Sequence, residues 1–323
     1  MKTFKTILLL ALPASGKSEV RNLMAHRKPS ILEKDFHIGE NLQLDDFPYV
    51  NFRRRIDQEL VKIGEPRLFY KNDEDTFYDG RDWGTLIQML NEDYHDLLNT
   101  NRVHPDSVSQ YLFERLDRCS LRVGLKPRLS LLKEEIRAKI ASALEKEAGE
   151  ILKGKESQRP DSFENKTIVI EAARGGKSGS PRPLKGTRGY QYSLSLFSPD
   201  LLQDAAILYI WVTPEESRRK NFARANPNDP GSNLFHGVPR AVRRDEYGVD
   251  DRKYLRDSSP VKDTITIVSS GKTFHLPIGV FDNRIDRTSF LREDPGKWEK
   301  KKVEAVTSSI KEATDARWKN YNK

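Results

Sequence analysis

The stretch TILLLALPASGKS, residues 6–18, decides the fold of this chain. Residues 5–12 form a near-continuous apolar run, which is the pattern of a parallel strand covered on both faces. A helix is expected over residues 17–27, and it must end before Pro29, because proline disfavours helical geometry in the residue before it. The sequence therefore predicts a strand, a tight turn and a helix in immediate succession.

The turn itself, ALPASGKS at residues 11–18, fits the pattern G-x-x-x-x-G-K-[ST] except that Ala11 stands at the first glycine. Such a turn aims successive backbone N–H groups at phosphate oxygens, and the helix N-terminus adds favourable dipole charge. Lys17 would reach the β- and γ-phosphates of a nucleotide, and the Ser18 hydroxyl would complete a Mg²⁺ shell. A chance match is the alternative, but the position between an apolar strand and a helix favours nucleotide binding. The expected nucleotide-binding residues here are Pro13, Ala14, Ser15, Gly16, Lys17 and Ser18.

The rest of the chain alternates strand and helix patterns around a helical segment. Alternation of this kind implies right-handed crossovers and a parallel sheet. Within the helical segment, Asp82 is expected to be the N-cap of one helix, and further helices are expected from Pro105 and from Ser130. Further strands are expected at residues 38–46, 166–171, 206–212, 264–268 and 276–281. We expect an α/β three-layer sandwich of the P-loop NTPase type, with a mostly parallel sheet of about five strands. Its core is expected to comprise residues 1–71 and 166–292. A helical insertion is expected at 72–165, and a C-terminal helix in 293–323.

Composition narrows the class of protein. A formal charge of +8 over 323 residues indicates anionic partners, either nucleic acid or small phosphorylated ligands. Cys119 is the only cysteine, which excludes an intrachain disulfide and a cysteine-based zinc site and suits a reducing cytosol. The first fourteen residues could be read as a signal peptide, but GKS at 16–18 explains the same apolar run as a buried strand. With no other stretch near the roughly 20 apolar residues of a membrane span, we expect a cytoplasmic protein without membrane contact.

Acidic residues follow two of the expected strands. The strand, turn and helix, followed by LDDFPY at 44–49, resemble the P-loop kinases of the uridine kinase and phosphoribulokinase type. The resemblance implies that Asp45 or Asp46 contacts or deprotonates the acceptor hydroxyl; a strand-ending turn capped by Asp is the alternative. Glu171 lies where such kinases place an acid, and it would serve Mg²⁺ through water or share the general-base role. Its alternative is a surface carboxylate at a strand end.

Basic residues gather in two later segments. Residues 172–199 carry five basic residues and five glycines without an acid, which predicts a flexible cationic loop, and Arg174 is the best candidate in it for a substrate or phosphate contact. The segment from Arg218 and Arg224 through residues 226–237 to Arg240, Arg243 and Arg244 resembles the lid of a P-loop kinase, which brings guanidinium charge onto the transferring phosphoryl group. A solvated helix face is the alternative. Asn283 resembles a residue that contacts the nucleotide base, although turn chemistry explains it equally well.

Three hypotheses follow for function. The first is phosphoryl transfer from ATP with Mg²⁺ to a small anionic or hydroxyl-bearing acceptor, a nucleoside or a nucleotide. The second is a nucleic-acid-associated NTPase or end-modifying enzyme, which ranks lower because the basic segments lack interleaved aromatic residues. The third is a nucleotide-dependent switch or scaffold in which the helical insertion docks a partner.

Overall fold

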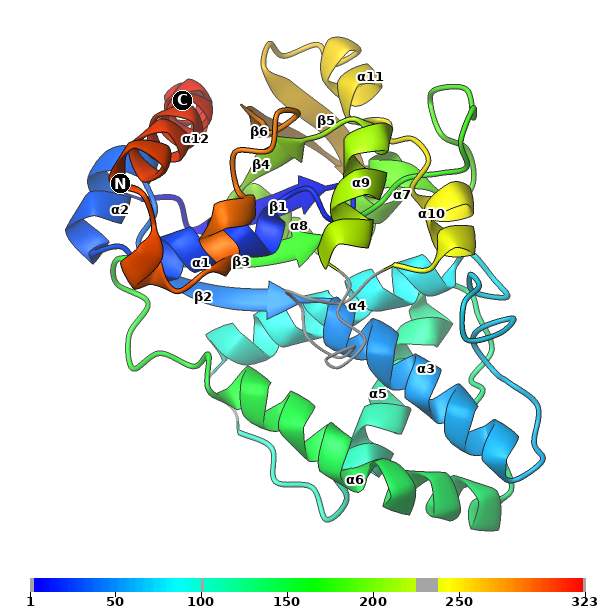
Figure 1. Cartoon of the computed structure of the whole chain (residues 1–323). Helices are drawn as coiled ribbons and strands as arrows, with labels where there is room; N and C mark the ends of the chain where they lie inside the picture. The colour runs from blue at the N-terminus through cyan, green and yellow to red at the C-terminus, as the bar shows by residue number, and fades with distance from the viewer. Residues whose placement is uncertain (1–2, 100–101, 225–237, 322–323) are drawn as a thin grey trace. The chain divides into compact units, whose positions relative to one another are not determined.

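The computed structural model describes residues 3–99, 102–224 and 238–321 (Figure 1). The chain divides into two compact units, one formed by Met1–Gln43 with Pro160–Lys323 and the other by Leu44–Arg159. The segment 226–237, expected to form the lid loop, lies outside the described residues.

A six-stranded sheet of order β2-β3-β1-β4-β6-β5 forms the centre of the first unit. Strand β1 lies between β3 and β4 and runs parallel to both, while β6 runs parallel to β4 and antiparallel to β5. The expected α/β fold with a mostly parallel sheet is therefore confirmed. The sheet has six strands rather than about five; each lies at a position where a strand was expected, and β5 is an antiparallel edge strand joined to β6 by a tight hairpin. The strands are β1 (Thr6–Ala11), β2 (Glu40–Asp45), β3 (Lys166–Ala172), β4 (Ala205–Trp211), β5 (Thr264–Ser269) and β6 (Lys272–Asp282).

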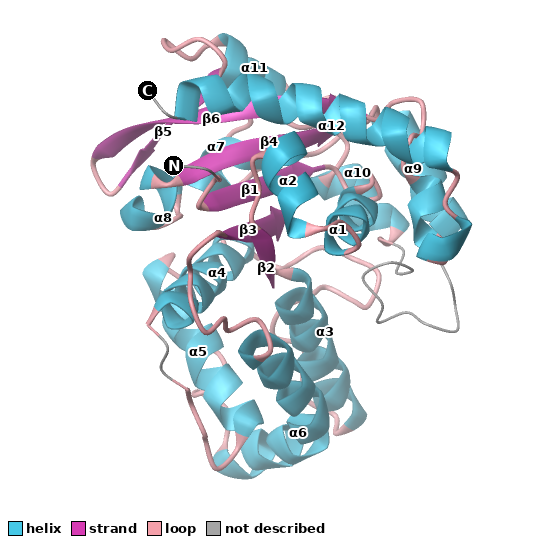
Figure 2. Ribbon diagram, turned by 90° about the vertical axis from the view of Figure 1, so that its left-hand side faces the viewer, coloured by secondary structure: helices cyan, strands magenta, loops and turns pink. Residues whose placement is uncertain are grey.

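Helices cover both faces of this sheet, an arrangement compatible with a three-layer sandwich. Alternate residues of β1 and β4 bury against one group of helices, as Leu9 and Leu208 show. Figure 2 shows this group, α1 (Lys17–Ala25), α2 (Pro29–Phe36) and α12 (Lys300–Tyr321), on the same face. The opposite side chains of β4 meet other helices, because Tyr209 packs edge-on against Tyr190 with ring centroids 6.1 Å apart. Those helices are α7 (Gly189–Ser195), α8 (Pro199–Gln203) and α11 (Arg252–Asp257).

The segment expected to be a flexible cationic loop, residues 172–199, is instead largely fixed. It contains α7 and the first residue of α8, and Gly176 pairs with Val249 through an isolated antiparallel bridge. A Cβ on Gly175 would lie 2.5 Å from the Val249 carbonyl oxygen. This glycine therefore serves a close approach of two backbones rather than flexibility.

The remaining elements of this unit follow β4 and β6. Helix α9 (Pro214–Arg224) begins directly after Thr213, whose hydroxyl accepts a hydrogen bond of 3.1 Å from the Glu216 amide. Helix α10 (Arg240–Glu246) comes later in the same stretch of chain, and two short 3₁₀ turns, η1 (Ser289–Arg292) and η2 (Pro295–Lys297), precede α12.

The second unit is helical: α3 (Phe47–Lys62), α4 (Asp82–Leu98), α5 (Val108–Arg122) and α6 (Glu134–Glu156). It starts at Leu44 and not at the expected residue 72, because α3 packs against α6, with an ion pair of 2.8 Å between Arg55 and Glu147. Asp82 is not the N-cap of α4; the cap is Arg81, and the fully buried Asp82 carboxylate accepts a 2.8 Å hydrogen bond from Arg53. Of the helices described in the chain, none has both the length and the apolar character that a bilayer crossing requires.

Candidate functional site

The 11–18 turn links β1 to α1, and its backbone conformation depends on Gly16. This residue is the N-cap of α1 and has φ 107°, in the left-handed region that favours glycine. A Cβ here would lie 2.4 Å from Thr288 Oγ1 and 2.7 Å from Asn283 Nδ2. Ala11, by contrast, is the last residue of β1 and has no positive φ, so alanine is accommodated in place of the motif's first glycine.

Three side chains from distant segments hold the carbonyl groups of the turn. Ser217 Oγ in α9 donates a hydrogen bond of 2.7 Å to the carbonyl oxygen of Pro13. Asn283 Nδ2, just after β6, donates one of 2.6 Å to Ser15 O, and the Tyr190 hydroxyl in α7 donates one of 3.0 Å to Ala11 O. The turn is therefore fixed from three sides through its acceptors.

The central backbone N–H groups of the same turn, in contrast to its carbonyl groups, are not used in hydrogen bonds among the described residues. Within the described part of the chain, the backbone amides of Ala14, Ser15 and Gly16 donate to no acceptor, and the buried Ser15 Oγ has no hydrogen-bond partner. Ala14 and Gly16 both have positive φ, at 55° and 107°. Successive amides in such a backbone form a concave nest that binds anions, and the nest lies at the N-terminus of a nine-residue helix.

Lys17, Arg21 and Glu171 form a charged cluster beside this nest. Lys17 Nζ lies 3.6 Å from Glu171 Oε1, and Arg21 Nη1 lies 2.8 Å from Glu171 Oε2. All three side chains are at most 16% exposed. Glu171 stands at the carboxyl end of β3 in register with Leu9 of β1, so the parallel pairing brings it to the turn. One carboxylate thus faces two cations, and the cluster carries a net positive charge.

Arg21 was not expected at the site. It follows Lys17 by one helical turn, so the two side chains share a face of α1, and this spacing was the available signal. Its Nε also donates a hydrogen bond of 2.9 Å to Gln43 Oε1. Arg21 therefore fixes the Glu171 carboxylate in place, while the longer Lys17 contact remains an ion pair without hydrogen-bond geometry.

A preformed metal cage is absent from the described residues, none of which form a group of three or more His, Cys, Asp or Glu side chains suited to a metal ion. The half-buried Ser18 and Glu171 supply oxygen donors at the turn. Mg²⁺ in nucleotide sites takes few protein ligands and is bound largely by phosphate oxygens and water. The residues present therefore fit a metal ion carried in by a nucleotide.

Asp45 and Asp46 lie at the junction of β2 and α3 and belong to the helical unit Leu44–Arg159. Asp45 Oδ1 accepts a hydrogen bond of 2.9 Å from the Phe47 amide, and Asp46 is the N-cap of α3, although its side chain makes no capping hydrogen bond. Asp45 thus has a turn-forming role, while the Asp46 carboxylate is not used for capping the helix.

Two other candidate residues, Asn283 and Arg174, are buried. Asn283 is fully buried, and its Nδ2 donates to Ser15 O and to Thr288 Oγ1 while its Oδ1 accepts from the Arg287 amide. Arg174 is 3% exposed, and its Nε donates a hydrogen bond of 3.1 Å to Ser193 Oγ. Asn283 therefore supports the turn from within the protein, while Arg174 is bonded to α7.

The arginines of the expected lid gather on α9 and α10. Arg218 is 45% exposed and pairs with Glu215 at 2.7 Å. The pKa of Arg243 is lowered by burial and by the neighbouring charges of Arg218 and Arg240. Arg243 Nε and Nη1 are buried without a hydrogen-bond partner among the residues that the structure describes, and its Cζ lies 4.4 Å from the Phe222 ring centroid. Arg224 ends α9, where only its backbone is described.

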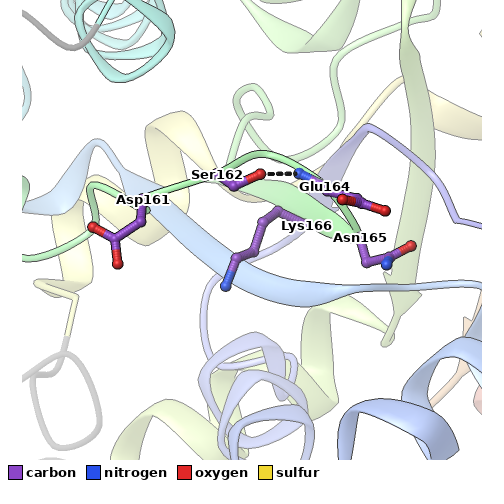
Figure 3. A pocket seen from close by; sticks show the side chains of 5 residues that line it. All are labelled: Asp161, Ser162, Glu164, Asn165 and Lys166. Atoms are coloured by element: carbon purple, nitrogen blue, oxygen red, sulfur yellow. Dashed lines mark hydrogen bonds between the residues drawn. The ribbon is translucent and has the colours of Figure 1, made fainter.

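A shallow hollow of about 420 Å³ lies on the segment before β3 (Figure 3). Two of its polar side chains have partners, since Ser162 Oγ accepts from the Glu164 amide and Lys166 pairs with Glu40. Comparison with known proteins found no matching family profile, no matching curated protein and no matching solved structure.

Proposed function

We propose that this protein is an ATP-dependent phosphotransferase that uses Mg²⁺ and acts on a small acceptor, a nucleoside or a nucleotide. The observation that carries the proposal is the division of roles in the 11–18 turn. Side chains of Ser217, Asn283 and Tyr190 hold its carbonyl groups, whereas the amides of Ala14, Ser15 and Gly16 have no acceptor among the described residues. An anion with several oxygens, such as a triphosphate, satisfies donors arranged in this way.

The charged cluster supplies the positive charge that such an anion needs. Lys17 would exchange its 3.6 Å contact with Glu171 for the terminal phosphate oxygens, and Arg21 would keep Glu171 in place at 2.8 Å. Bound Mg²⁺ would neutralise charge on the phosphates, held on the protein side by Ser18 and through water by Glu171. The chain's own contribution is therefore positioning and electrostatic stabilisation.

Arg218 and Arg243 are the proposed lid cations. Arg218 pairs only with a carboxylate that is itself 73% exposed, and Arg243 has no carboxylate partner in the described segments. Guanidinium groups of this kind stabilise charge that develops on a transferring phosphoryl group. Asp45 and Asp46 are the proposed acids for the acceptor hydroxyl, and Asp46 is the better candidate because its carboxylate does not cap α3.

The test is a panel of acceptors incubated with γ-labelled ATP and Mg²⁺. The panel contains nucleosides, nucleotides, sugar alcohols and a short oligonucleotide with a free 5′ hydroxyl, and labelled product is separated from phosphate. We expect label in a small acceptor, and we expect Lys17→Ala to abolish it. The matched control is Lys5→Ala, which removes a lysine that is 56% exposed and paired with Asp204. Label only in the oligonucleotide, or turnover that survives Lys17→Ala, would contradict the proposal.

A further inference from the structure

A second cavity, of about 590 Å³, opens where β4 turns into α9, and none of its lining residues belongs to the 11–18 turn. We propose that this cavity, the Trp211 pocket, binds a small phosphorylated organic ligand through Arg252 and Arg182. Its wall combines Trp211, Val212 and Pro214 with residues of α11. The volume falls in the range of small-molecule sites, and the wall combines apolar and aromatic residues with charged ones.

Arg252 is the feature that points to an anion. The residue is only 6% exposed, its Nε has no hydrogen-bond partner, and within the described residues no carboxylate lies within ion-pair distance of its guanidinium. Its Cζ lies 4.6 Å from the Tyr209 ring centroid and 5.6 Å from that of Trp211. The aromatic faces stabilise the cation in part, but they supply no hydrogen-bond acceptor. A buried donor such as Arg252 Nε is unfavourable without an acceptor, and an anion in the cavity would supply one.

The acids of the pocket are already used by other groups. Asp250 Oδ2 accepts a hydrogen bond of 2.7 Å from the Tyr209 hydroxyl, and its Oδ1 accepts one of 2.9 Å from the Arg252 backbone amide. Asp257 pairs with Lys253 and with Arg256. Both carboxylates line the cavity, but neither lies within ion-pair distance of the Arg252 guanidinium, and with Arg182, Arg252 and Lys253 the lining still has one more cation than anions.

Arg182 provides the second positive charge. Its Nε donates to the Asp250 carbonyl oxygen at 3.1 Å, and its Nη1 donates to the Ser180 carbonyl oxygen at 3.3 Å. These neutral acceptors orient the guanidinium without cancelling its charge. Two guanidinium groups, one buried and one exposed, match a phosphate dianion better than a carboxylate, which has a single charge.

The organic part of the ligand follows from the rest of the wall. Tyr254 lines the cavity, is 42% exposed and belongs to the same helix as Arg252. With the phosphate group at Arg252, Tyr254 and Val249 would contact the uncharged part of the molecule. Bare phosphate is therefore expected to bind more weakly than a phosphate ester with an aromatic or apolar group.

Phenyl phosphate is the probe, titrated into the ¹⁵N-labelled full chain carrying Lys17→Ala so that the 11–18 turn contributes little. The readout is the Trp211 indole cross-peak, assigned by Trp211→Phe. We expect a saturable shift of this peak, a smaller shift with inorganic phosphate, and none with phenol. Adding Arg252→Gln should weaken binding by about tenfold or more, since a charge-assisted contact is lost.

Two further variants separate ligand contact from folding. Arg182→Gln changes an exposed side chain and should weaken binding of phenyl phosphate without moving the other indole peaks. Lys253→Gln removes a lysine of the pocket rim whose charge is already paired with Asp257, and it should leave the affinity within about twofold. A Trp211 peak that stays fixed, an equal response to phenol, or unchanged affinity in both arginine variants would overturn the proposal.

Discussion

Ser217 Oγ donates a hydrogen bond of 2.7 Å to the carbonyl oxygen of Pro13, although 204 positions separate the two residues. Both are buried. The contact makes the geometry of the turn after β1 depend on α9, the helix that also carries Arg218. One hydrogen bond therefore links α9, which carries a proposed lid arginine, directly to the proposed phosphate loop.

Replacing Ser217 with Ala should raise the KM for ATP several-fold, because Pro13 O loses its donor and the loop loses one of its three supports. The stability loss should be about 1 kcal/mol, typical of one hydrogen bond. Ser269→Ala is the matched control: this serine is equally buried, and its Oγ donates a bond of 2.7 Å to Phe197 O, away from the loop. Urea unfolding and ATP kinetics are measured on both variants. An equal change in the KM for ATP in the two variants would contradict a specific role of Ser217 in the loop.

Gly16→Ala should abolish ATP binding. It should also lower the free energy of unfolding. The positive φ alone costs an alanine about 1–3 kcal/mol, and the loss should exceed this because the new Cβ also overlaps Thr288 and Asn283. Gly179→Ala separates the two effects. It has a similar φ of 80°, but a Cβ there would meet nothing within 4 Å. Chemical denaturation should show a clearly larger loss for Gly16→Ala, and equal losses would contradict the packing of Thr288 against the loop.

Arg243→Gln should lower kcat by about tenfold or more while leaving the dissociation constant for ATP nearly unchanged, since the proposed lid cations act on charge that develops during transfer. Its buried guanidinium has no acid partner among the residues described, so its loss should not weaken folding. Arg256→Gln, which removes an arginine already paired with Asp257, is the control and should retain full kcat. A fall in ATP affinity with unchanged kcat would assign Arg243 to ground-state binding instead.

Arg317 provides a pH test of the fold. It is fully buried in α12 over the Phe4 ring, without a hydrogen-bond partner for any of its nitrogens in the described chain, and burial lowers its pKa to about 9. Below pH 9 Arg317 is protonated in both the folded and the unfolded chain, and the full cost of burying its charge remains. Above pH 9 the folded chain loses the proton that the unfolded chain keeps, so the free energy of unfolding rises with pH.

Arg317→Met should therefore be more stable than the parent at pH 7, by about 1–4 kcal/mol, because a well-packed apolar residue replaces an uncompensated charge. The difference should shrink between pH 9 and pH 11. Lys319→Met, an exposed change on the same helix, is expected to show neither effect. Urea unfolding at three pH values measures the difference in the free energy of unfolding between each variant and the parent. A destabilised Arg317→Met would indicate that the guanidinium has an anionic partner in solution.

The sheet was largely predictable because most of its strands contain a short apolar run bounded by polar residues; β2, with the sequence ENLQLD, is the exception. Runs such as residues 166–171 and 206–212 carry their own signal, and the structure places strands within a residue of them. The start of the helical unit was not predictable in this way. Helix α3 follows β2 directly, and only its packing against α6 assigns it to that unit.

The site was predictable where one local motif specifies it and not where distant residues meet. Residues 11–18 predict an anion-binding turn by their spacing alone, and the structure has the expected strand before the turn and helix after it. The role of Asn283 could not be read from sequence, because a polar residue after a strand has the same local pattern whether it supports a loop from inside or faces a ligand. Arg243 likewise resembles its neighbour Arg244 in sequence, yet only Arg243 is buried.

The most direct test of the central claim is a calorimetric titration of MgATP into the wild-type chain and into Lys17→Ala, with Lys5→Ala alongside. The account predicts saturable one-to-one binding to the wild type and to Lys5→Ala, and a loss of affinity of about a hundredfold or more for Lys17→Ala, because a charge-assisted contact to the phosphates is removed in a partly buried site. Equal affinity in all three proteins, or no binding to the wild type, would contradict it.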